Sequence, residues 1–394
     1  MKSTFYYICA VAMLFCFLRN SAAQEIRKQG RYYVAETTRT FKTGKRGTLR
    51  VQDIRGDVTI DAWTKNEVRV KEFTKMDVFT REEAETFLKK SRSTYRQNGD
   101  IIEIGGQTYR RDWIKSEFEI NVPDGFSVDV RTRGGDLLVT GVNGDVRLET
   151  SGGDIDLRNI GGEIDARTSG GDVTVEHSSN RVRVKTSGGD LTLEDIGGEL
   201  LAKTSGGDVT LDGSTGMVDL QTSGGDIEIR NAGADVTANT SGGDIEIYDT
   251  KGPTEVHTSG GDIQFRNIGG RLKASTSGGD IEGRSVDGTV RVSTSGGSIE
   301  LKDVKGGVQA KTAGGDITVE VTLTDFKVDH RIELRTFGGE ITLYIPEKLP
   351  ATIYAEIENT DRWQHYNIFS DFPLTSSEKT EKEGKWFSRG NKFI

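Results

Sequence analysis

The sequence predicts an all-β protein, a parallel β-solenoid (a single-stranded β-helix) built from 18-residue coils with two short strands in each coil. Eleven Gly-Gly pairs begin at residues 134 to 314, and the interval between neighbouring pairs is always 18. Each pair is followed by alternating apolar and polar residues, as in the segment 155–158. This period of two is typical of a half-buried strand. Two short strands cannot bury an apolar face alone, so successive coils are expected to stack.

The first element is a secretory signal peptide, expected over residues 1–23. A lysine precedes the apolar stretch 5–18, and the small residues 21–23 offer a cleavage site. Both cysteines, Cys9 and Cys16, lie in this stretch, so the exported chain is expected to lack thiol chemistry. A leader that is retained as a membrane anchor is the alternative. No later apolar run reaches 18 residues, so we expect no transmembrane span after signal removal, and export to the periplasm, the cell surface or the medium.

Residues 24–131 are predicted to form an N-terminal β region that contains the first coils. The segments 47–51 and 56–60 repeat the half-coil pattern of a glycine followed by alternating residues, so winding is expected to start near residue 47. An insertion then interrupts the pattern with one short helix near 80–90. That segment combines a capping-box spacing with apolar residues three and four positions apart.

The regular solenoid is predicted over residues 132–320. Apolar residues 18 apart, such as Ile155 and Val173, are expected to form inward-facing columns. Right-handed winding is favoured by the general crossover rule, although coils of the other hand exist. Threonine precedes the Ser-Gly-Gly turns at an inward position, where its hydroxyl can bond along the stack. An outward, ice-binding threonine array is the disfavoured alternative. The predicted structural ladder is Thr150, Thr168, Thr186, Thr204, Thr222, Thr240, Thr258, Thr276, Thr294 and Thr312.

Residues 321–394 are predicted to form irregular coils and a C-terminal cap. The 18-residue period is lost after residue 326, and aromatic residues become frequent. The last coil of a solenoid has an unpaired edge that can recruit another strand. Self-association through this terminal coil is therefore one hypothesis for a partner.

Charge is unevenly distributed along the chain, whose formal net charge is −9. Residues 132–320 carry 31 acidic and 18 basic side chains, a net charge of −13, whereas residues 1–131 carry 18 acidic and 24 basic side chains, a net charge of +6. An acidic solenoid is a poor partner for nucleic acid, because phosphate binding requires positive charge. No nucleic-acid partner is expected.

The aspartate that follows each Gly-Gly pair is the main candidate for a site. Stacked coils would place these carboxylates about 4.8 Å apart. One hypothesis is a line of calcium sites, because Ca²⁺ binds carboxylate and backbone oxygens. The third glycine of known calcium-binding rolls is absent, so the favoured interpretation is hydrogen bonding to turn amides, with no metal or other cofactor. The weaker calcium candidates are Asp154, Asp172, Asp190, Asp208, Asp226, Asp244, Asp262 and Asp280.

A polysaccharide lyase or hydrolase is the alternative function, because long β-solenoids often cleave acidic polysaccharides. Such sites need acid, base and cationic groups that converge on one face. The residues that depart from the repeat are instead scattered over many coils, so we expect no enzymatic activity and assign no catalytic residues. These departures include His177, Tyr248, Pro253, His257 and Ser298.

The copies of Thr-Ser-Gly-Gly-Asp-Ile behind a signal peptide resemble the bacterial putative-adhesin family, a group of exported β-solenoid proteins of unassigned function. The resemblance covers roughly residues 40–394, and the segment 368–374 is similar to the last segment of that family. Family members usually continue with a further glycine-rich strand, so the stop at Ile394 suggests a truncated chain or an unusual cap. The resemblance implies an envelope or surface role and brings no catalytic residues.

The hypothesis from the sequence is therefore a non-catalytic, exported solenoid. It would present a rigid acidic surface for binding or assembly at the bacterial envelope. The partner would be an envelope or surface polymer, or another protein. The calcium-binding roll ranks third, after the polysaccharide-processing enzyme.

Overall fold

The computed structural model describes residues 25–90, 92–106, 114–322, 330–359, 367–372, 377–380 and 389–393. The predicted signal peptide and Ile394 lie outside the described residues. Among the helices that the model describes, none is long and apolar enough to cross a membrane.

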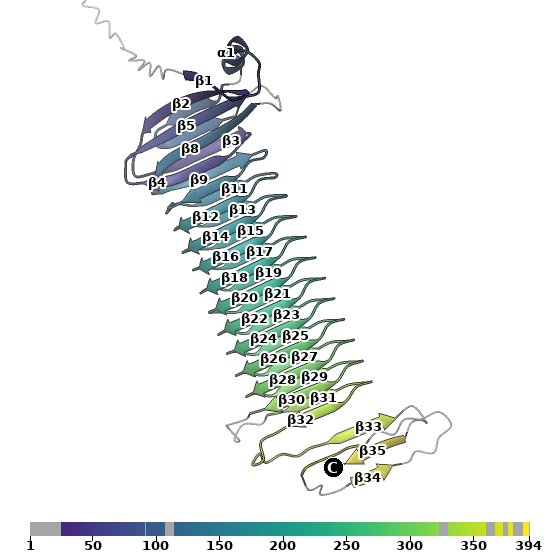
Figure 1. Cartoon of the computed structure of the whole chain (residues 1–394). Helices are drawn as coiled ribbons and strands as arrows, with labels where there is room; N and C mark the ends of the chain where they lie inside the picture. The colour runs from purple at the N-terminus through teal and green to yellow at the C-terminus, as the bar shows by residue number, and fades with distance from the viewer. Residues whose placement is uncertain are drawn as a thin grey trace, which may run out of the picture.

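The chain forms a parallel β-solenoid of about eleven 18-residue turns, which confirms the predicted fold class (Figure 1). Two long sheets line the solenoid, and each coil contributes one strand to each sheet. We call the sheet of even-numbered strands in the regular coils sheet A and the facing one sheet B. In the solenoid, sheet A contains β10 (Leu137–Thr140), β12 (Ile155–Ile160), β14 (Val173–Ser178), β16 (Leu191–Ile196), β18 (Val209–Ser214), β20 (Ile227–Ala232), β22 (Ile245–Thr250), β24 (Ile263–Ile268), β26 (Ile281–Val286), β28 (Ile299–Val304), β30 (Ile317–Val321) and β32 (Ile341–Tyr344).

Sheet B is built in the same way from the second strand of each coil. Its solenoid strands are β9 (Gly125–Thr132), β11 (Val146–Glu149), β13 (Ile164–Arg167), β15 (Val182–Lys185), β17 (Leu200–Lys203), β19 (Val218–Gln221), β21 (Val236–Asn239), β23 (Thr254–His257), β25 (Leu272–Ser275), β27 (Val290–Ser293), β29 (Val308–Lys311) and β31 (Ile332–Arg335).

The core consists of apolar columns between the two sheets. Ile155 pairs with Val173 on sheet A, and Ile164 pairs with Val182 on sheet B, each 18 residues apart. These side chains are at most 2% exposed. Their sequence neighbours point outward and are polar, because successive side chains of a strand lie on opposite faces. The period of 18 therefore places equivalent residues directly above one another.

The first coils do not stack in chain order. The coil of β3 (Arg46–Ile54) and β4 (Val58–Trp63) lies between two coils that come later in the sequence. On one side it pairs with β9 and β10, so that Val58 meets Leu137. On the other side it pairs with β7 (Ile101–Gly105) and β8 (Ile114–Pro123). The insertion after β4 thus returns as an outer coil, and the 18-residue spacing does not apply to these pairs.

The remaining N-terminal elements close the edge of the outer coil. Sheet A continues in antiparallel fashion from β8 through β5 (Glu67–Met76) and β2 (Tyr32–Lys42) to β1 (Glu25–Gln29). Sheet B ends with β6 (Thr94–Asn98), antiparallel to β7. The one short helix, α1 (Arg81–Lys90), confirms the predicted helical insertion and packs apolar side chains against the same cluster as β2 and β5.

At the C-terminal end the solenoid register survives a longer connection. Ile317 pairs with Ile341, which is 24 residues later, across a connection that includes residues 323–329 outside the described part. Beyond β32, a separate antiparallel sheet contains β33 (Ala355–Asn359), β34 (Ser377–Thr380) and β35 (Arg389–Phe393).

Candidate functional site

The Ser-Gly-Gly-Asp turn is shaped by its second glycine. A Cβ atom on Gly171 would lie 2.2 Å from the carbonyl oxygen of Gly153 and 2.5 Å from Asp154 Oδ1, both in the preceding coil. A Cβ atom on Gly170 would have no neighbour closer than 3.9 Å. The missing side chain of the second glycine therefore lets each turn rest directly on the turn above it.

The aspartates after these glycines form a continuous hydrogen-bonded column along one edge of the solenoid. Asp172 N–H donates to Asp154 Oδ1 at 2.8 Å, and Asp154 N–H donates to Asp136 Oδ1 at 2.9 Å. The sequence predicted bonds from each aspartate to turn amides, and the structure places the donor in the next coil. The same bond, at 2.7 to 3.0 Å, is accepted by Asp57, Asp136, Asp154, Asp172, Asp190, Asp208, Asp226, Asp244, Asp262 and Asp280.

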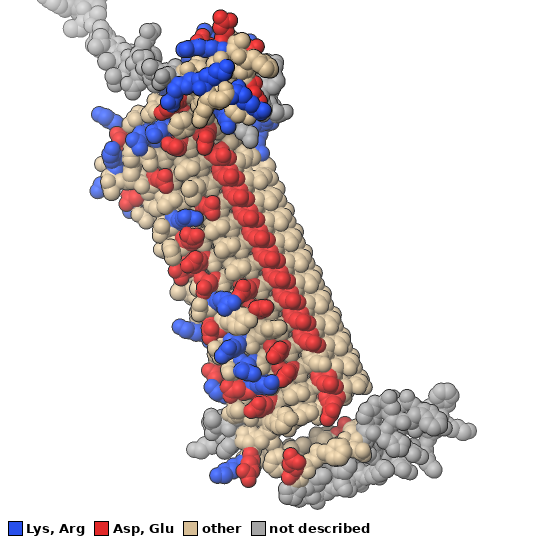
Figure 2. All heavy atoms as spheres, viewed as in Figure 1, with Lys and Arg blue, Asp and Glu red and all other residues tan. Residues whose placement is uncertain are grey.

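The column continues past its one departure from the acidic pattern. Ser298 N–H donates to Asp280 Oδ1 at 2.7 Å, and Ser298 Oγ accepts from Asp316 N–H at 3.2 Å. Asp316 then accepts from Glu340 N–H. The side chains of this column are exposed, and Figure 2 shows them as a nearly unbroken acidic stripe beside a surface of uncharged residues. We call this set, from Asp57 to Glu340, the aspartate column.

The aspartate column also perturbs a neighbouring acid. The pKa of Asp156, on the outer face of β12, is raised mainly because the side chain is partly buried. The negative charges of Asp154, Glu176 and Asp136 raise this pKa further, while Arg158 lowers it. Negative charge thus accumulates where the column meets sheet A.

Metal-binding geometry was sought among the eight calcium candidates and elsewhere. In the part of the chain that the structure describes, no group of three or more His, Cys, Asp or Glu side chains could hold a metal ion. Each candidate aspartate already uses one oxygen in its bond to the next coil. Calcium binding therefore stays an untested hypothesis.

The threonine column lies inside the solenoid behind the aspartate column. Thr186 Oγ1 donates to the carbonyl oxygen of Gly171 at 2.8 Å and accepts from Gly189 N–H at 3.3 Å. The hydroxyl therefore links its own turn to the preceding one through glycine backbone atoms, and not through other threonines as the sequence suggested. The donor bond is repeated at 2.7 to 3.1 Å in all ten members of the predicted ladder from Thr150 to Thr312.

A second polar column, which the sequence analysis missed, follows the opposite end of the sheet A strands. Its residues adopt positive φ near 55°, a conformation that Gly, Asn and Asp tolerate best. The available signal was the recurrence of these residue types every 18 positions from residue 141. The column contains Gly141, Asn159, His177, Asp195, Gly213, Asn231, Asp249, Asn267, Ser285 and Asp303.

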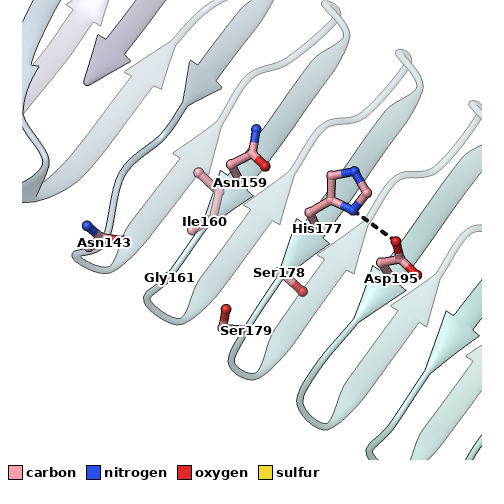
Figure 3. Close-up of a pocket in the computed structure, with 8 residues that line it drawn as sticks. All are labelled: Asn143, Asn159, Ile160, Gly161, His177, Ser178, Ser179 and Asp195. Carbon is pink, nitrogen blue, oxygen red and sulfur yellow. Dashed lines mark ion pairs between the residues drawn. The ribbon is translucent and has the colours of Figure 1, made fainter. Parts of the chain in front are cut away.

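His177 belongs to this column and lines a shallow pocket of about 410 Å³ (Figure 3). Its Nδ1 lies 3.0 Å from Asp195 Oδ2 in the next coil. The neighbouring Ser178 is buried, and its hydroxyl has no hydrogen-bond partner. No bond joins this serine to His177, so the three residues do not form a nucleophile activated by a base.

The other departures from the repeat do not converge with His177. His257 lies on sheet B, where its Nδ1 is 3.0 Å from Ser275 Oγ. Tyr248 lies on sheet A, donates to Glu246 and stacks against Arg230. Pro253 precedes β23, and Ser298 belongs to the aspartate column. These residues occupy separate coils, so no acid, base and cationic group meet on one face.

Comparison with known proteins gives a family and a set of similar folds. The model of the Toastrack DUF4097 family matches residues 40–282 and 233–390. No curated protein matches the chain. Similar solved structures include putative adhesins from Bacteroides fragilis NCTC 9343 (13% identity, TM-score 0.22, covering 78% of this chain and 96% of that one), Parabacteroides merdae ATCC 43184 (10%, 0.21, 79% and 96%) and Parabacteroides distasonis ATCC 8503 (12%, 0.26, 78% and 96%).

Proposed function

This chain belongs to the Toastrack DUF4097 family, whose function is unassigned, and from that premise we propose that it is an exported, non-catalytic solenoid. Its rigid acidic surface would bind a polymer or another protein at the bacterial envelope. The aspartate column is the observation that carries this proposal. It is the longest uninterrupted array of one charge that the described residues form on the surface shown in Figure 2.

The column is rigid because its backbone and side chains are fixed by the same contacts. Each carboxylate accepts a bond from the next coil, while the turn behind it is tied to its neighbour by a buried threonine. One oxygen of each exposed aspartate is thereby fixed, and its charge stays at the surface. The chain therefore presents regularly spaced negative charges without ordering mobile side chains on binding, which lowers the entropic cost of association.

A matching partner would carry repeated cationic groups. Single exposed ion pairs contribute little. Many such contacts on one rigid array add through multivalency, and the resulting affinity falls as salt screens the charges. A polymer or an extended protein segment fits this geometry, because the column is a line and not a pocket. Catalysis is not part of the proposal, because the candidate acids and bases lie on separate coils.

The test removes charge from the column while keeping its hydrogen bonds. In the variant Asp190→Asn/Asp208→Asn/Asp226→Asn, each asparagine retains the Oδ1 acceptor that binds the next coil. The matched control, Glu163→Gln/Glu199→Gln/Asp235→Asn, removes the same number of charges from the turns at the other edge of the solenoid. All six side chains are exposed.

Binding is measured by co-sedimentation with beads that carry an isolated envelope fraction, and albumin-coated beads serve as the blank. We expect the column variant to lose most of the salt-sensitive binding and the control to retain it. Equal binding by the column variant and the wild-type chain would refute the role of the column. Binding of the wild-type chain that does not weaken with salt would refute the electrostatic basis.

A further inference from the structure

The outer face of sheet A carries a run of stacked acidic residues. The outward residues of β14, β16 and β18 are one threonine and one acid per strand, with no basic residue. Glu176, Glu194 and Asp212 lie in register on these three neighbouring strands. Glu176 also contacts Arg158 in the coil above, at 3.4 Å. We call these three acids the acidic cluster, and their net charge is −3.

The outer face of sheet B carries the opposite charge at the same height. Arg183 and Lys185 point outward from β15, and Lys203 points outward from β17, where it lies in register with Lys185. In the part of the chain that the structure describes, these three side chains form no ion pair. We call them the basic cluster, and their net charge is +3.

The two clusters belong to the same coils. β14 and β15 form one coil, and β16 and β17 form the next, so two successive coils carry acid on one face and base on the other. Like charges that stand opposite each other on neighbouring strands destabilise a sheet. Each cluster is therefore unfavourable in an isolated solenoid and would be relieved by a surface of opposite charge.

The shapes of the two faces also match. Thr174, Thr192 and Thr210 stand beside the acidic cluster, and their short side chains leave room for longer ones. The basic side chains are long, and the half-buried Leu201 between them offers an apolar contact. Both faces have the same strand spacing, because they belong to the same coils.

We propose that a second copy of this chain docks side by side, with the basic cluster of one copy against the acidic cluster of the other. Equal heights of the two clusters require the solenoids to point in the same direction. The contact is head-to-tail in the lateral sense, since each copy keeps one free cluster of each sign, and such contacts add copies without closing. This inference does not depend on the proposed function, because the aspartate column lies at an edge outside both clusters.

The test uses the purified chain in sedimentation velocity and light scattering over a range of concentrations. At about 20 mM salt, where screening is weak, we expect the weight-average mass to rise at least about twofold with concentration. At about 0.5 M salt, where charges are screened within a few ångströms, we expect the chain to stay monomeric.

Two charge-reversal variants make the test specific. Lys185→Glu/Lys203→Glu leaves negative charge on both faces, and Glu194→Lys/Asp212→Lys leaves positive charge on both faces. Each variant alone is expected to remain monomeric, and an equimolar mixture is expected to associate again. Circular dichroism verifies that both variants are folded. Their binding to the envelope fraction separates this inference from the proposed function, because the aspartate column is intact in both.

Three outcomes would overturn the proposal. The first is a wild-type chain that stays monomeric at low salt and high concentration. The second is a folded variant that associates on its own as the wild-type chain does. The third is a mixture of the two folded variants that stays monomeric.

Discussion

The two glycines of each turn are predicted to differ sharply in their tolerance of a methyl group. In the middle of the solenoid, a Cβ atom on Gly207 would lie 2.1 Å from the carbonyl oxygen of Gly189, whereas one on Gly206 would lie 3.5 Å from that of Gly188. The second distance is an ordinary contact. The first lies well below the 3.0 Å under which real Cβ atoms are essentially never found. Gly207→Ala must therefore separate two coils by about 1 Å.

This separation breaks identifiable bonds. Asp208 N–H donates to Asp190 Oδ1 at 2.8 Å, and Thr204 Oγ1 donates to Gly189 O at 2.9 Å. An added 1 Å takes both beyond hydrogen-bonding range. Each bond lost at a buried group costs about 1–3 kcal/mol. We expect Gly207→Ala to lower the free energy of unfolding by about 2–5 kcal/mol, and Gly206→Ala to change it by less than about 1 kcal/mol.

Urea unfolding followed by circular dichroism measures both variants. Solenoids can unfold in parts, since each coil contacts only its neighbours. Limited proteolysis therefore accompanies the unfolding curves, and we expect new cleavage of Gly207→Ala near the altered coil. Two variants with the same unfolding midpoint and the same cleavage pattern would refute the argument from close stacking.

Three further predictions concern the other columns. Thr186→Val removes the hydroxyl that bonds Gly171 O and is expected to cost about 1–3 kcal/mol of unfolding free energy, while Thr186→Ser costs less; equal losses in urea unfolding would contradict the ladder. Asn159→Val places a branched residue at φ 55° and is expected to cost about 1–2 kcal/mol, while Asn159→Gly is tolerated; a stable valine variant would contradict the positive-φ column. The raised pKa of Asp156 means that its protonated form favours folding at low pH and that this contribution is lost as the pH rises through the raised pKa. Asp156→Asn should therefore raise the melting temperature at pH 7 and leave it unchanged well below the ordinary carboxyl pKa of about 3.9, and a lower melting temperature at pH 7 would contradict the sign.

Much of the regular solenoid could be predicted from the sequence, because a period of 18 and an alternation of two together specify which residues face inward. Ile155 and Val173 needed no other information to be placed in one column. The order of the first coils could not be predicted in this way. Val58 pairs with Leu137 only because the insertion after β4 folds back as β7 and β8, and that choice depends on tertiary pairing rather than on a repeat.

The candidate site was predictable in its residues but not in its bonds. The aspartates and threonines were visible as rows, whereas their partners depend on how closely two turns approach. Gly171 decides this distance, and the sequence alone does not show which glycine of a pair faces the neighbouring coil. The positive-φ column, in contrast, left a signal in residues such as Asn159 and Asn231 that the analysis overlooked.

The central claim is that residues 18 positions apart stand one above another along a single axis. Spin labels test it directly, because the chain has no cysteine apart from Cys9 and Cys16, which serine can replace. Labels on cysteines at Ser169 paired with Ser223, Ser277 or Ser295, all exposed, report distances by electron double resonance. The account predicts a linear increase of about 4.8 Å for each coil between the labels. Distances that level off, or that shrink between the more remote pairs, would contradict it.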